Sequence, residues 1–182
     1  MTALSKTAVK KRLMALEKEE LVELICQLYS ENRAVKDKLN VSFQGESYIA
    51  ELVSDYCQKI HKVMFPNNIG RGGDYKAAKR LLADFKERCT DLEAQARVHL
   101  QFALDGTHFT EYVGDMSTAY YRAVLTSYQV AVHFAEGQGD FFESVRQDLK
   151  YIYQAGFDIG WGFSEGVADI FGQIAWMYDD DE

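Results

Sequence analysis

The chain has 182 residues, of which 47% are hydrophobic and 26% are charged, and its formal net charge at pH 7 is −8. This apolar content excludes global disorder and suits one domain, with or without a small N-terminal appendage. Residues 1–88 hold 16 Lys or Arg against 12 Asp or Glu, whereas residues 89–182 hold 4 against 16. We therefore expect the two halves to present surfaces that favour different partners.

The N-terminal residues lack the apolar stretch of a signal peptide, and no later run is long and apolar enough to cross a bilayer. The three cysteines, Cys26, Cys57 and Cys89, are an odd number and form no Cys-x-x-Cys pair. Each falls within a helical pattern, so we expect all three to be buried free thiols. These features predict a cytoplasmic protein that does not enter the membrane.

The first half of the chain is predicted to be helical, because its apolar residues recur three and four positions apart. We expect a short helical hairpin with its apolar positions between residues 13 and 28, and Ser5 as the cap of the first helix. A third short helix is expected over 31–39. A longer helix over 48–64 must end before Pro66, the only proline of the chain.

The helical pattern continues after a loop at 66–74, with an apolar face over 78–85. Thr90 and Glu93 have the spacing of a capping box, which predicts that another helix begins there. That helix is expected to end near Gly114, and Gly106 is expected to break or kink it.

Three further helices are predicted in the second half. The apolar pattern over 116–131 ends at Gly137, and the pattern over 142–153 ends at Gly156. The last helix is expected over about 164–178.

The fold class is therefore all-α, a single domain of about seven to nine helices packed as antiparallel hairpins, with an irregular α-solenoid as a variant. We expect residues 1–40 to form the N-terminal hairpin plus a short helix, and residues 41–178 to form the main bundle. Residues 179–182 are an acidic tail.

The glycine-rich loop before residue 75 is a candidate anion site, because free amides at a helix N-terminus attract negative charge. Its candidate binding residues are Arg71, Lys76, Lys79 and Arg80. The loop lacks the Gly-Lys-Ser/Thr ending of a phosphate-binding P-loop. Asp74 at the cap would also occupy those amides, so a solvated connector is the favoured interpretation.

The N-terminal hairpin is loosely similar to the small DNA-binding SAP modules and carries several lysines and arginines, among them Lys10, Lys11 and Arg12. Glutamates in the same segment would repel phosphate, so we favour an ordinary helical hairpin.

No catalytic or metal-binding constellation is evident in the sequence. Asp105 and His108, like His133 and Glu136, have one-turn spacing, but no Glu-x-x-His unit of a di-iron bundle occurs. No catalytic residue, metal ligand or cofactor is therefore predicted.

Glycine and aromatic residues alternate between Gly156 and Phe163, and such a segment is a poor helix former. We expect Trp161 and Phe163 to be inserted between helices as a structural plug, with close backbone approach at the flanking glycines. The alternative is an aromatic pocket for a ligand, which Tyr120 and Tyr121 would help to line.

Four stretches in this order resemble a family of small bacterial helical proteins known only as a domain of unknown function. They are residues 13–28, the loop and helix start over 70–85, Tyr112-Val113-Gly114-Asp115 and Ile159-Gly160-Trp161-Gly162-Phe163. The resemblance spans most of the chain. It implies a bacterial, cytosolic, all-α protein and supplies no activity.

These observations favour a non-enzymatic protein that binds another macromolecule, most simply another protein, through a groove or a charged face. Two alternatives stay open. One is a small-ligand binder or enzyme with a pocket around Trp161, and the other is a nucleic-acid binder that uses the basic first half. The oligomeric state is not indicated.

Overall fold

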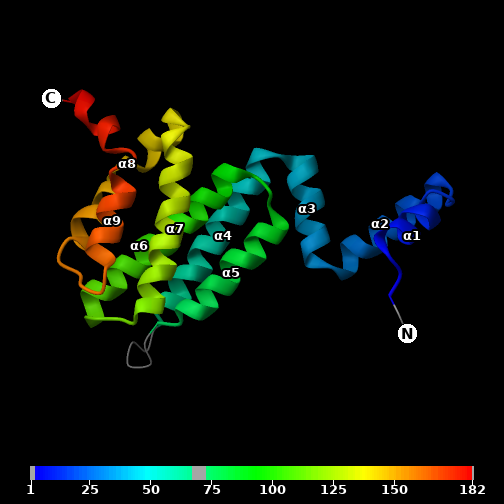
Figure 1. The fold of residues 1–182 in the computed structure, drawn as a ribbon. Coiled ribbons are helices and arrows are strands. Elements are labelled where there is room, and N and C mark those ends of the chain that lie inside the picture. The colour runs from blue at the N-terminus through cyan, green and yellow to red at the C-terminus, as the bar shows by residue number, and fades with distance from the viewer. Residues whose placement is uncertain (1–2, 67–72, 182) are drawn as a thin grey trace. The chain divides into compact units, whose positions relative to one another are not determined.

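The computed structural model describes residues 3–66 and 73–181, and within these ranges the chain forms nine α-helices, one 3₁₀ helix and no strand (Figure 1). The predicted all-α fold is confirmed. The chain divides into two compact units, Met1–Gly45 and Glu46–Glu182. Within the described ranges, no helix combines the length and the apolar character that crossing a bilayer requires.

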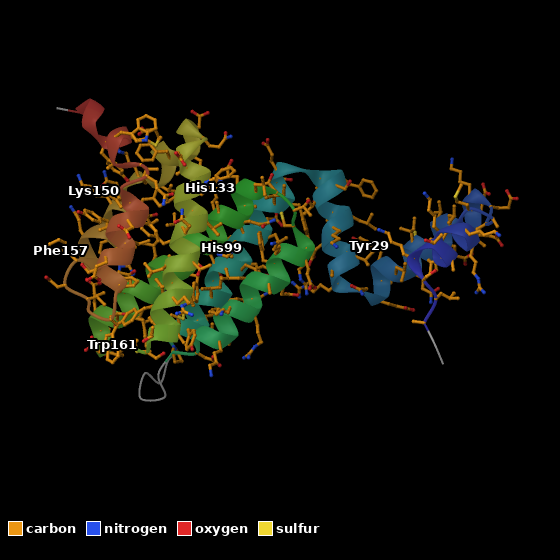
Figure 2. The ribbon with its side chains drawn as sticks, viewed as in Figure 1. Tyr29, His99, His133, Lys150, Phe157 and Trp161 are labelled. Atoms are coloured by element: carbon orange, nitrogen blue, oxygen red, sulfur yellow. The ribbon has the colours of Figure 1, made fainter. Side chains whose placement is uncertain are left out.

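The first unit contains α1 (Lys6–Leu13), α2 (Lys18–Glu31) and α3 (Arg33–Gln44). The Ser5 side chain caps α1 as predicted, because its Oγ accepts a hydrogen bond from the Ala8 amide at 3.3 Å. Tyr29, labelled in Figure 2, donates its hydroxyl to the Asn40 side chain at 3.2 Å and so connects α2 with α3. Of the described residues of α1 and α2, none is buried.

The second unit contains the remaining helices, α4 to α9, followed by the 3₁₀ helix. Successive helices run in opposite directions (Figure 1), as the predicted antiparallel hairpins require. Their bounds are α4 Glu46–Met64, α5 Tyr75–Arg88, α6 Leu92–Val113, α7 Thr118–Glu136, α8 Gly139–Gly156, α9 Phe163–Phe171 and the 3₁₀ helix Ala175–Asp181. Helix α6 lies at the centre and contacts α4, α5, α7 and α8.

The N-cap of helix α6 lies one residue later in the chain than the sequence pattern predicted. The N-cap is Asp91, whose side chain accepts from the Ala94 amide at 2.8 Å, so the assignment of the cap to Thr90 was wrong. The C-terminal end follows the prediction: Gly114, with φ of +86°, ends the helix in a conformation that favours glycine.

Gly106 does not break α6, so the predicted interruption of the helix was wrong. The helix is continuous through it, and a Cβ built there would lie 2.5 Å from Cγ2 of Val124 on α7. Tyr120 of α7 donates its hydroxyl to the Gly106 carbonyl at 2.6 Å. Gly106 is therefore needed for the close packing of α7 on α6, and tertiary packing outweighs its weak helix propensity.

The last predicted helix is divided in two. Helix α9 ends at Phe171, and the 3₁₀ helix begins at Ala175 after a turn at Gly172. Tyr178 of the 3₁₀ helix packs its ring 5.1 Å from that of Phe142 and donates its hydroxyl to the Arg146 carbonyl at 2.8 Å. Glycine at the end of α9 and the docking of Tyr178 on α8 together explain the interruption.

The three thiols lie in different environments, so the prediction that all are buried holds for Cys89, holds only in part for Cys57 and was wrong for Cys26. Cys26 is exposed, because α2 buries none of its residues, whereas Cys57 is half-buried and Cys89 is buried. Burial raises the pKa of the Cys57 thiol to about 11, with a further contribution from the Asp105 carboxylate. Burial also raises the pKa of Cys89.

We predict that one thiol of three reacts rapidly with a disulfide reagent such as DTNB in the folded protein. Cys26 is accessible, whereas Cys57 and Cys89 are shielded and held in the unreactive thiol form at neutral pH. Stopped-flow absorbance should show a fast phase of one equivalent that the Cys26→Ser variant lacks. A second fast equivalent would contradict the assignment.

Candidate functional site

The predicted binding residues fall into two separate places. Lys76, Lys79 and Arg80 lie together on α5 and line one hollow of the surface. Trp161 belongs to the loop between α8 and α9, and Phe163 is the first residue of α9. Arg71 lies outside the described residues.

Two adjoining hollows, of about 360 and 420 Å³, run between α5 and α7 and share Lys79 and Ala119 in their lining. We call them together the α5–α7 groove. Its walls carry four cationic side chains, three from α5 and one from α7: Lys76, Lys79, Arg80 and Arg122. The rest of the lining is apolar or uncharged: Tyr75, Leu82, Ala83, His99, Ala119, Ala123, Thr126 and Ser127.

Helix geometry explains why the cations of α5 share a face. Lys76, Lys79 and Arg80 are three and four residues apart, so they project from one side of the helix. Ala78 and Phe85 are buried on the other side. The groove stays open because the residues that face it from α7 include the small side chains of Ala119 and Ala123.

The cations of the groove are largely uncompensated. No Asp or Glu belongs to the lining of either hollow. Arg80 lies 3.8 Å from Asp74, but both side chains are mostly exposed, so this ion pair is weak. Among the residues that the structure describes, Lys76, Lys79 and Arg122 have no ion-pair partner.

Asp74 also determines what the start of α5 can bind. Its Oδ1 accepts from the Ala77 amide at 2.8 Å, and its carboxylate therefore already occupies the N-terminus of the helix. This confirms the expected cap and leaves the side chains of the groove, rather than helix amides, as the means of binding an anion.

His99 of α6, labelled in Figure 2, is half-buried and forms part of the groove floor. Its Nδ1 lies 3.0 Å from the hydroxyl oxygen of the buried Ser127. Burial, aided by the positive charge of Lys86, lowers the pKa of His99 to about 4. The floor of the groove is therefore uncharged at neutral pH.

Sequence reasoning missed Arg122 and His99, because each comes from a different helix than the basic cluster of α5. Arg122 had a signal in the sequence, since it is one of only 4 Lys or Arg residues after residue 88. His99 had none, because its place in the groove depends on how α5 and α7 pack against α6.

A second polar cluster joins α4 to α6. His61 Nδ1 lies 2.9 Å from Oδ1 of Asp105, whose side chain is buried. Oδ2 of Asp105 has no hydrogen-bond partner among the described residues. Burial raises the pKa of this carboxyl group, and the hydrogen bond with His61 acts in the opposite direction.

This cluster lies beside a hollow of about 300 Å³ that Cys57, His61 and Gln101 help to line. With its pKa near 11, the Cys57 thiol is protonated at neutral pH and is a poor nucleophile. The one-turn spacing of Asp105 and His108 does not identify the histidine that Asp105 contacts. Asp105 bonds instead to His61, 44 residues away. Within the described part of the chain, no group of three or more His, Cys, Asp or Glu side chains could hold a metal ion.

Another hollow, of about 540 Å³, separates α4 from α6 and is lined in part by Val53, Glu93 and Arg97. Two of its charged groups engage each other: Arg97 bonds to Glu93 at 2.8 Å, and it also bonds to Ser144 at 3.0 Å. It offers fewer unsatisfied charges to a partner than the α5–α7 groove does.

The prediction that Trp161 is buried was wrong, and the plug is Phe163 alone. The Trp161 side chain is 62% exposed, whereas Phe163 is 1% exposed and its ring lies 5.0 Å from that of Tyr121. Trp161 and Gly162 have φ of +62° and +74°, and this turn directs the indole outward before α9 begins.

The expected close backbone approach occurs at other glycines. A Cβ at Gly160 or Gly162 would meet nothing within 4 Å, whereas one at Gly156 would lie 2.8 Å from Val167. Trp161 lines none of the four hollows described above. The expected pocket around Trp161 is therefore not among them.

No protein-family model, curated protein or solved structure matches this chain. The resemblance to a bacterial family stays a prediction. A functional assignment therefore depends on the geometry and charge of the sites themselves.

We predict that Phe163→Ala lowers the free energy of unfolding by about 3–5 kcal/mol, because it leaves a cavity at a fully buried ring. Trp161→Gly should change it by less than about 1 kcal/mol, since the ring is exposed and glycine accepts the positive φ without strain. Urea unfolding followed by circular dichroism measures both. A loss at Trp161 as large as that at Phe163 would contradict the geometry.

We predict that His99 makes stability depend on pH between about 6.5 and 4. The folded protein holds His99 neutral in this range while the unfolded chain takes up a proton, so stability is complete above pH 6.5 and falls as the pH approaches 4. The contribution is at most about 3 kcal/mol. His99→Asn should flatten this part of the stability profile, and an unchanged profile would contradict the prediction.

Proposed function

We propose that the chain is a non-enzymatic interaction protein that binds an acidic segment of another protein in the α5–α7 groove. The observation that carries this proposal is the lining of the groove, which has four cationic side chains and no carboxylate on a chain of net charge −8. A local positive surface on an acidic protein steers negatively charged partners to one place.

The apolar part of the groove favours a peptide over a nucleic acid. Leu82, Ala119 and Ala123 offer contacts that suit aliphatic side chains between the acidic residues of a peptide. A nucleic acid would need more phosphate contacts than four cations provide, and it would meet the negative charge of the second half.

The polar groups favour binding over catalysis. The Cys57 thiol has a pKa of about 11 and the His99 imidazole a pKa of about 4, so neither is poised for proton transfer at neutral pH. The three free thiols also support our proposal that the protein works in a reducing compartment such as the cytoplasm.

The test uses a fluorescein-labelled peptide of alternating glutamate and leucine, titrated with the intact protein and followed by anisotropy. We expect saturable binding that weakens with added salt. Lys79→Glu combined with Arg122→Glu should weaken it by about tenfold or more, because two attractive charges become repulsive on opposite walls of the groove.

The matched control is Lys10→Glu combined with Lys11→Glu, which makes the same change of charge on α1 in the first unit. This control should leave the affinity within about twofold. Equal losses in both double variants would show that net charge alone attracts the peptide. Tighter binding of a single-stranded oligonucleotide of equal charge would favour the nucleic-acid alternative instead.

A further inference from the structure

Trp161 holds a conformation that gives the fold no visible benefit. It is the one non-glycine residue with positive φ in the described part of the chain, and a bulky side chain is strained there. Its indole is 62% exposed and makes no hydrogen bond or ring contact with the described residues. Backbone strain of this kind is typical of functional positions.

Other large apolar side chains are exposed at the same end of the second unit. Phe157 is 67% exposed on the same loop, and Tyr112 at the end of α6 is 66% exposed. Figure 1 shows that the α6–α7 connection and the α8–α9 loop share this end, and Figure 2 labels Phe157, where the loop leaves α8, and Trp161, just before α9 begins. We call Tyr112, Val113, Phe157 and Trp161 the aromatic end patch.

The end patch has a fixed support. Tyr121 is buried beneath it, where its ring packs on Phe163 and its hydroxyl oxygen accepts from the Met116 amide at 3.0 Å. Ser164 donates its hydroxyl to the Phe157 carbonyl at 2.8 Å and closes the α8–α9 loop. The exposed rings are therefore presented by an ordered loop rather than by a loose one.

The charged residues in the segments that carry the patch have one sign. Asp115, Asp158 and Glu165 are exposed and lie within the α6–α7 connection, the α8–α9 loop and the first turn of α9. Residues 98–121 and 151–182 contain no Lys or Arg. The described residues of these segments thus offer aromatic faces and carboxylates.

We propose that the aromatic end patch binds a lysine- or arginine-rich segment of another protein. Cationic heads of such a segment would lie over the Trp161 and Phe157 rings, to which cations are attracted, and would pair with the nearby Asp158. Their aliphatic stems would cover the apolar parts of the patch. This surface is separate from the α5–α7 groove and selects a partner segment of the opposite charge.

Charge also decides against two other occupants. Anionic lipid headgroups would be repelled by the three carboxylates. A symmetric contact between two copies would place the acidic residues of one patch against the same acidic residues of the other copy, and these like charges repel each other.

The test exploits the presence of two tryptophans in the chain. Trp176→Phe leaves Trp161 as the only indole, and we titrate this variant with an acetylated octa-arginine peptide while recording its emission. We expect a saturable change in emission whose midpoint rises with salt. In Trp161→Phe the remaining Trp176, which donates to the Gln173 carbonyl at 3.1 Å, should not respond.

Affinity is measured separately by anisotropy of the fluorescein-labelled peptide. Trp161→Gly should weaken binding by about tenfold, and its circular dichroism spectrum confirms that the variant is folded. Asp158→Asn should weaken binding several-fold. Asp140→Asn is the matched control, because it removes the same charge at the other end of α8, and it should leave the affinity within about twofold.

Three outcomes would overturn the proposal. They are an unchanged affinity in Trp161→Gly, equal losses in the Asp158 and Asp140 variants, and a self-association in sedimentation experiments that Trp161→Gly abolishes. The combined Lys79→Glu and Arg122→Glu variant should bind octa-arginine no more weakly than the wild type. Failure of the groove proposal therefore leaves this one intact.

Discussion

The close approach of α6 and α7 at Gly106 is the contact on which both candidate surfaces depend. Because Gly106 has no side chain, the Val124 side chain of α7 can pack against it. The buried Tyr120 hydroxyl donates a hydrogen bond to the Gly106 carbonyl at 2.6 Å. An added methyl group would lie 2.5 Å from Val124, well inside van der Waals contact. The position of α7 along α6 is thereby fixed by steric fit and by a directional hydrogen bond.

Once α7 is fixed, its two sides take on different roles. Ala119, Arg122 and Ala123 face α5 and form one wall of the groove, where small residues leave space for a ligand. Tyr121, one residue from both Tyr120 and Arg122, packs on Phe163 instead and supports the loop that carries Trp161. One helix therefore positions a basic groove and an acidic aromatic patch, which matches the division of charge between the two halves of the sequence.

The sequence predicted those features that depend on local periodicity and missed those that depend on tertiary contacts. The helices, the Ser5 cap and the Asp74 cap follow from local patterns along the chain. No such periodicity exists in the Gly-Trp-Gly-Phe segment, so the sequence does not indicate which of its two aromatic side chains is buried. Phe163 is buried through its contact with Tyr121, 42 residues earlier, and the pairing of His61 with Asp105 was equally hidden.

Asp105 and His99 show how the same physical cause gives opposite dependences on pH. Burial disfavours the charged form of each group, so it raises the pKa of the Asp105 carboxyl and lowers that of the His99 imidazole. The folded protein consequently holds a proton on Asp105 at pH values where the unfolded chain releases it, and this group favours folding more as the pH falls. His99 acts in the other direction between pH 6.5 and 4, since there it is the unfolded chain that binds the extra proton. The two buried groups therefore contribute to the pH dependence of stability with opposite signs.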